Sequence, residues 1–250
     1  MAKPKPKKSA ATRSTGNRRD QLASFEAARK KEQRRRTLLL LSACVVVAAL
    51  LLAYPVFLFV QDARLRGAEL PDLGTSAAEA ACTPEESNPA TGNQEHVADG
   101  TQVDYDRLPP DSGPHLNHWA PFTKKFYSTE DRPVVEELVH NLEHGYTIVW
   151  YDPNMPEDQL KDLEYISKTF GGNDFVKDKF IAAPWTGADG QALPEGKVLT
   201  MVRWTADPQN PAEASTQKGI RTSCGAVSGE VVENFMKKYP STAAPEPNGG

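Results

Sequence analysis

Residues 133–151 read PVVEELVHNLEHGYTIVWY, and within them a helical pattern passes directly into a strand pattern. The apolar side chains of the first part share one arc of about 140° on a helical wheel, and they are Val134, Val135, Leu138, Val139 and Leu142. A proline in the first turn and Gly145 just past the end predict a helix over Pro133–His144. The apolar run that follows predicts a strand over Tyr146–Tyr151, buried on both faces.

The opposite arc of this helix carries ionisable side chains, among them His140, Glu143 and His144. His140 and His144 are four residues apart, so their rings can converge on one point, and this spacing suits zinc or copper. The sequence therefore predicts a divalent metal site formed by His140 and His144 together with His115 and His118 of the preceding loop. The alternative is a solvated helix face, with the loop histidines holding a turn by hydrogen bonds.

All five histidines of the chain lie between positions 96 and 144. Residues 140–144, HNLEH, also match the H-x-x-E-H pattern of inverted zinc peptidases. In that chemistry two histidines bind zinc and the glutamate, here Glu143, is the catalytic general base. This domain is smaller than the domains of those peptidases. The chain has no Gly-x-Ser-x-Gly elbow, phosphate-binding loop or dinucleotide fingerprint.

The hydrophobic pattern predicts further elements on both sides of residues 133–151. They are a short strand over His96–Tyr105, a loop over Leu108–Pro121, a helix over Pro156–Phe170, strands over Phe180–Trp185 and Val198–Trp204, and a helix over Val227–Tyr239. The last two strands are expected to form a hairpin around residues 187–196. This order predicts an α+β domain at 95–240, a small mixed sheet with three helices, followed by a flexible tail at 241–250.

An uncharged apolar segment lies at Thr37–Val60, and its 24 residues are enough for a transmembrane helix. Thirteen Lys and Arg residues precede it, and few follow it closely. The positive-inside rule then predicts a single-pass protein of the plasma membrane, with the N-terminus in the cytoplasm and the C-terminal domain outside. A cleaved signal peptide is the alternative, but its apolar region is ordinarily shorter.

The charge is divided unequally, since residues 1–36 carry a net charge of +10 and the rest −14. The acidic larger part excludes a uniformly basic nucleic-acid binder. We expect residues 1–20 to be disordered, and residues 21–36 to form a basic helix that contacts anionic lipid headgroups. Residues 61–94 read as a linker without a clear period.

Three cysteines are present. Cys44 lies within the apolar segment, whereas Cys82 and Cys224 both fall on the side predicted to be outside, where disulfides persist. We therefore predict a disulfide between Cys82 and Cys224. The absence of a Cys-x-x-Cys motif argues against a redox catalyst.

Two stretches, Leu108–His115 (LPPDSGPH) and Val139–Gly145 (VHNLEHG), resemble motifs of the bacterial domain-of-unknown-function family 3105. The resemblance covers roughly residues 96–246 and includes His-Val at 96–97 and Ala-Pro-Glu at 244–246. It implies that His115, His140, Glu143 and His144 form a site, but it implies no reaction. Many relatives have a Pro-Cys-Gly-like stretch where this chain reads WAPFT at 119–123.

Three functions follow as hypotheses. The first is a membrane-anchored outer domain that binds a divalent metal or a small ligand through the histidines and Glu143. The second is a zinc-dependent surface hydrolase that uses Glu143 as its base. The third is a structural or interaction module of the cell envelope, whose protein partner the sequence leaves unknown.

Overall fold

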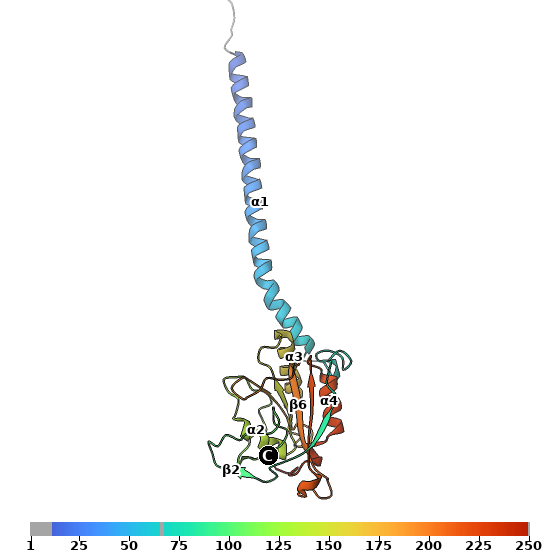
Figure 1. Ribbon diagram of the computed structural model, residues 1–250. Helices are drawn as coiled ribbons and strands as arrows, with labels where there is room; N and C mark the ends of the chain where they lie inside the picture. The colour runs from blue at the N-terminus through green and yellow to red at the C-terminus, as the bar shows by residue number, and fades with distance from the viewer. Residues whose placement is uncertain (1–11, 66–67, 250) are drawn as a thin grey trace, which may run out of the picture. The chain divides into compact units, whose positions relative to one another are not determined.

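The computed structural model describes residues 12–65 and 68–249. The chain divides into two compact units between Ala63 and Arg64. The first unit holds all but the last two residues of the long helix α1 (Thr12–Leu65), and the second holds the domain that carries the sheet (Figure 1).

Helix α1 spans Thr12–Leu65 and includes Pro55. Its stretch Leu22–Phe57 is long and apolar enough to cross a membrane, and it alone meets that test in the described part of the chain. Apolar side chains such as Leu51 and Phe57 are exposed along it, and water is a poor surrounding for so long an apolar surface. Residues 12–20, expected to be disordered, form the first turns of this helix, and of their residue types only Arg is a strong helix former. Residues 1–11 lie outside the described part.

The second unit is built on a five-stranded mixed sheet, which confirms the α+β class. Its strands are β1 (Glu86–Pro89), β4 (Thr147–Tyr151), β5 (Phe180–Pro184), β6 (Leu199–Thr205) and β7 (Lys218–Cys224). They lie in the order β1-β7-β6-β4-β5, and only β4 and β5 pair in parallel. Every residue of β4 is buried, as its apolar run predicts for a central strand.

Helices cover both faces of this sheet. Helix α2 (Val135–Glu143) packs Leu138, Val139 and Leu142 on one face, beside Trp150 and Trp204. Helices α3 (Glu157–Thr169) and α4 (Gly229–Lys238) pack on the other face. Three short 3₁₀ turns complete the unit, at Leu70–Asp72, Ala214–Thr216 and Ser241–Ala243. The three α-helices match the number expected from the sequence.

The expected hairpin between the two strands at 180–204 is wrong, because β4 lies between β5 and β6. Helix α3 makes the crossover that returns the chain parallel to β4. The loop after β5 then carries the chain to the opposite edge of β4, where β6 pairs antiparallel. Strand β7 had no predicted counterpart, because its charged, glycine and hydroxyl residues lack a clear alternation.

Residues 70–94, expected to be linker, pack against the sheet. Strand β1 pairs with β7, and Leu73 and Ala80 are buried. Cys82 and Cys224 form a disulfide with an S–S distance of 2.04 Å, which ties this segment to the end of β7. A backbone that pairs with a sheet edge and carries a covalent tie need not have a strong hydrophobic period of its own.

Candidate metal centre

A second, two-stranded sheet places two histidines side by side. Strands β2 (His96–Val97) and β3 (His115–Leu116) pair in parallel with His96 opposite His115, and the two ring centroids are 5.0 Å apart. Gly92 permits this pairing, because a Cβ there would lie 2.1 Å from the carbonyl carbon of Gly113. The two segments therefore pass each other at Gly92 and Gly113, where no side chain separates their backbones.

The LPPDSGPH segment folds into a rigid support for His115. Asp111 is buried and forms an ion pair with Arg107 at 2.9 Å. The same carboxylate packs against β7, where a Cβ on Gly219 would lie 2.2 Å from its Oδ1. At the end of the segment, Nδ1 of His115 lies 2.8 Å from the Gly113 carbonyl oxygen. A carbonyl can only accept, so Nδ1 donates, and in the neutral ring Nε2 then keeps a free lone pair.

Helix α2 is fixed against this loop by its own polar side chains. The Asn141 amide accepts from the Ala120 N–H at 2.9 Å and donates to the Ala120 carbonyl at 3.0 Å. On the residue just before Asn141, Nδ1 of His140 donates to the Leu116 carbonyl at 2.5 Å. The Nε2 lone pair of His140 is thus also left free, and backbone hydrogen bonds of this kind orient histidines that bind metals.

Glu143 presents one carboxylate oxygen to the histidines. Its Oε1 accepts a hydrogen bond from the Gln94 N–H at 2.7 Å. Its Oε2 lies 2.9 Å from Nε2 of His115, and both side chains are fully buried. Neither atom makes a hydrogen bond of acceptable geometry to any described residue. At 2.9 Å the two atoms are close enough to share a proton as an ion pair, or to be bridged by a cation.

Four residues offer their ligand atoms within 4.8 Å of one another, and they are His96, His115, His140 and Glu143. His96 is exposed and the other three are buried, so the group has one side open to solvent. Three imidazole nitrogens and one carboxylate oxygen suit zinc, copper or another first-row divalent metal. This part of the domain could therefore hold such an ion.

The protonation states also suit a metal. Burial, helped by the neighbouring His144 and His115 rings, lowers the pKa of His140 to about 4. Burial also lowers the pKa of His144. For Glu143 burial acts to raise the pKa, but the contacts from His115 and the Gln94 N–H outweigh it and the pKa is lowered. His140 and His144 are then neutral and Glu143 ionised at neutral pH, the forms that bind metals.

The other two predicted ligands lie outside this group of four. His144 is buried with its ring centroid 4.5 Å from that of His140, and its Nε2 has no hydrogen-bond partner in the described chain. His118 is half exposed, and it lies 3.7 Å from an Asp99 carboxylate oxygen and 3.6 Å from one of Glu137. His96 was not among the predicted ligands, although the clustering of all five histidines pointed toward it.

The polar face of α2 is not solvated, which was the alternative to a site. His140 and His144 are each 3% exposed and Glu143 is 0% exposed. The loop at 115–120 covers this face through the contacts of Asn141 and His140. Trp119, 43% exposed, stands edge-on to His140 and His144 with centroid distances of 5.2 and 5.0 Å. These buried ionisable side chains therefore need a structural or chemical partner.

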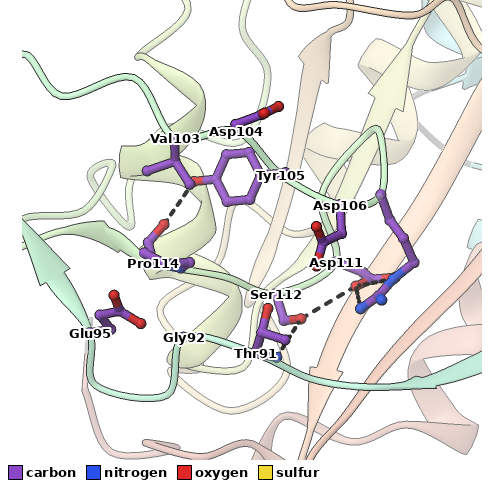
Figure 2. Close-up of a pocket in the computed structure, with 11 residues that line it drawn as sticks. Thr91, Gly92, Glu95, Val103, Asp104, Tyr105, Asp106, Asp111, Ser112 and Pro114 are labelled. Atoms are coloured by element: carbon purple, nitrogen blue, oxygen red, sulfur yellow. Dashed lines mark hydrogen bonds and ion pairs between the residues drawn. The ribbon is translucent and has the colours of Figure 1, made fainter.

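A pocket of about 250 Å³ is lined by Glu95 and Pro114, which immediately precede two of the four residues. In Figure 2, Tyr105 on its wall donates a hydrogen bond from Oη to the Pro114 carbonyl at 2.9 Å. Asp104 and Asp106 add carboxylates to that of Glu95. The negative charge of this pocket favours the approach of a cation.

Comparison with known proteins gave one family. The family model described as a protein of unknown function, DUF3105, matches residues 96–249. This range contains all four grouped residues and both motifs found in the sequence. No curated protein and no solved structure matched the chain.

Proposed function

The chain belongs to the DUF3105 family, and we propose that its C-terminal domain binds one divalent transition metal through His96, His115, His140 and Glu143. The observation that carries this proposal is the buried pair formed by Nε2 of His115 and Oε2 of Glu143. A cation between these two atoms would satisfy both lone pairs at once.

The donor set narrows the class of metal. Calcium and magnesium prefer oxygen ligands, so three imidazoles argue against both. None of the four residues contributes sulfur, so soft Cu(I) is also a poor match. Zinc and Cu(II) remain the best candidates, since both take imidazole together with carboxylate.

The position of Glu143 favours binding over hydrolysis. A zinc hydrolase of the H-x-x-E-H type needs this glutamate off the metal, where it can take a proton from water. Here Glu143 belongs to the group of four, its Oε2 lies 2.9 Å from Nε2 of His115, and its Oε1 is held by the Gln94 N–H. We therefore assign Glu143 as a ligand and propose no reaction.

We place this site outside the cell, on a domain anchored by α1. Two features support that location. The basic residues before the apolar stretch favour a cytoplasmic N-terminus. The Cys82–Cys224 disulfide suits an oxidising compartment. The same basic residues would contact anionic lipid headgroups, each contributing about 1 kcal/mol near the surface.

Metal titration of the full-length protein in detergent tests the proposal. The untagged, chelator-stripped protein should bind one zinc or copper ion per chain, and His115→Ala or His140→Ala should abolish binding. His118→Ala is the matched control, because His118 lies on the same loop but outside the group of four. Absence of binding by the wild type, or loss of binding in the His118→Ala control alone, would contradict the proposal.

A further inference from the structure

The C-terminal strap, residues 241–249, folds back over the end of α2. Helix α2 ends at Glu143, and Gly145, with a φ of +85°, turns the chain into β4. The last carbonyls of a helix lack partners within it and carry a partial negative charge. The strap and its anchor supply those partners, because the Glu246 N–H donates to the Glu143 carbonyl at 3.0 Å and Lys179 Nζ donates to the His144 carbonyl at 2.7 Å.

Lys179 fastens the strap to the helix end. Its side chain is fully buried, and Nζ also donates to the carbonyls of Pro247 at 2.9 Å and Gly249 at 2.8 Å. The ammonium group therefore holds two strap carbonyls and one helix carbonyl, that of His144, in a single cluster. Hydrogen bonds to a charged group are stronger than those between neutral groups, so this contact resists fraying.

Glu246 joins the strap to both segments that supply ligands. Its backbone carbonyl accepts from Nδ1 of His144 at 3.2 Å. Its side-chain Oε1 accepts from Nε2 of Gln94 at 2.7 Å. The backbone N–H of that same Gln94 orients the Glu143 carboxylate, and Gln94 lies two residues before His96. Glu246 thus links the end of α2, through His144, to the segment that leads into β2 and His96, through Gln94.

We propose that Glu246 is a positioning residue for the metal centre, and this inference rests on the proposed function. Glu246 does not touch the metal. It fixes the Gln94 segment against the end of α2, so that Glu143 Oε2 and the His96 ring stay within reach of one ion. Loss of a residue that orients a ligand typically lowers metal affinity about 10–100-fold.

Cobalt binding to the full-length protein in detergent provides the test, because the visible absorption of Co²⁺ reports both affinity and coordination geometry. Glu246→Ala should bind Co²⁺ at least about tenfold more weakly and with an altered spectrum. Glu246→Gln should restore both, since its amide oxygen can still accept from Gln94 Nε2. Asn248→Ala, at an exposed strap position, is the control and should match the wild type.

A second variant breaks the same bond from its other end. Gln94→Ala removes the side-chain donor but keeps the backbone N–H that holds Glu143. It should reproduce the loss in Glu246→Ala, and the double variant should be no weaker than either single one, because both remove one interaction. Additive losses in the double variant would overturn the bridge, whether or not Glu246→Ala itself folds less well.

The two proposals fail in different ways. A wild-type protein that binds no Co²⁺ rejects the metal centre itself. Wild-type binding together with an unchanged affinity and spectrum in Glu246→Ala rejects only the positioning role.

Discussion

Nε2 of His115 lies 2.9 Å from Oε2 of Glu143, although the two residues are 28 positions apart in the sequence and both are fully buried. The proton of a neutral His115 sits on Nδ1, which faces the Gly113 carbonyl. Two lone pairs therefore face each other at hydrogen-bond distance. A second proton on His115, shared as an ion pair with Glu143, or a metal ion bound by both atoms relieves this arrangement, and the proposed metal centre is the second of these.

Replacing the carboxylate ligand tests the role of Glu143. Glu143→Gln keeps the shape of the side chain but removes its charge. We expect zinc affinity to fall by more than the roughly 100-fold seen when an orienting partner is lost. Competition with a chelating indicator measures this change. A wild-type affinity in this variant would remove Glu143 from the ligand set.

His96 and His115 should separate metal binding from folding. His96 is exposed, so His96→Ala should weaken zinc binding and leave the free energy of unfolding of the metal-free protein within about 0.5 kcal/mol of wild type. His115→Ala leaves the buried Gly113 carbonyl without its donor, so it should also destabilise the fold by about 1–3 kcal/mol. Denaturant unfolding after chelation distinguishes the two. If His96→Ala and His115→Ala lowered the free energy of unfolding equally, the structural role assigned to the buried His115 would be contradicted.

The metal-free protein should lose stability in mild acid. The pKa of His140 is about 4 in the folded state, below the ordinary value of 6.5. The unfolded chain therefore binds more protons between these two values, so the free energy of unfolding falls as the pH drops from about 6.5 to 4. His144, whose pKa is also lowered, acts in the same direction.

Denaturant unfolding of the chelated protein at a series of pH values measures this effect. His140→Gln should flatten the slope by up to about 1.4 kcal/mol per pH unit, which corresponds to one proton. An unchanged slope in that variant would show that His140 is not the group responsible.

The disulfide should stabilise the domain independently of the metal. It joins Cys82 and Cys224, which are 142 positions apart. Cys82→Ser should lower the free energy of unfolding by about 3–5 kcal/mol. Cys44→Ser is the control, because Cys44 is a free and exposed thiol of α1. Denaturant unfolding followed by tryptophan fluorescence measures both, and an unaffected Cys82→Ser protein would contradict a structural disulfide.

A methyl group at the end of α2 should disturb the strap. Gly145 has a φ of +85°, and a Cβ there would lie 2.5 Å from the Ser241 carbonyl oxygen. Gly145→Ala should therefore cost about 1–3 kcal/mol of stability and also weaken metal binding. Gly187→Ala is the matched control, since a Cβ on Gly187 would meet no atom within 4 Å. Equal stability of the two variants would contradict a tightly packed strap.

Local patterns predicted the parts of the fold that depend on neighbouring residues. The apolar arc of α2 and the continuous run of β4 are both visible in residues 133–151. The hairpin prediction was wrong because β5 and β6 pair with opposite edges of β4 and not with each other. The hydrophobic period of a strand does not show which neighbour it pairs with.

In the metal centre, too, some residues could be predicted from a local pattern and others could not. His140 and Glu143 stand out because they share one face of a helix. His96 reaches His115 only through the pairing of β2 with β3, which depends on a backbone crossing at Gly92. The covering of His144 by Glu246 spans 102 positions. Contacts of such separation leave no periodic signal in a single sequence.

The metal content of the protein as it is made tests the central claim most directly. Full-length protein extracted from membranes and purified without chelator should contain about one zinc or copper ion per chain by elemental analysis. The ion should be missing from His140→Ala purified in the same way. A folded wild-type protein that carries no metal, and takes up none at micromolar zinc or copper, would contradict the account.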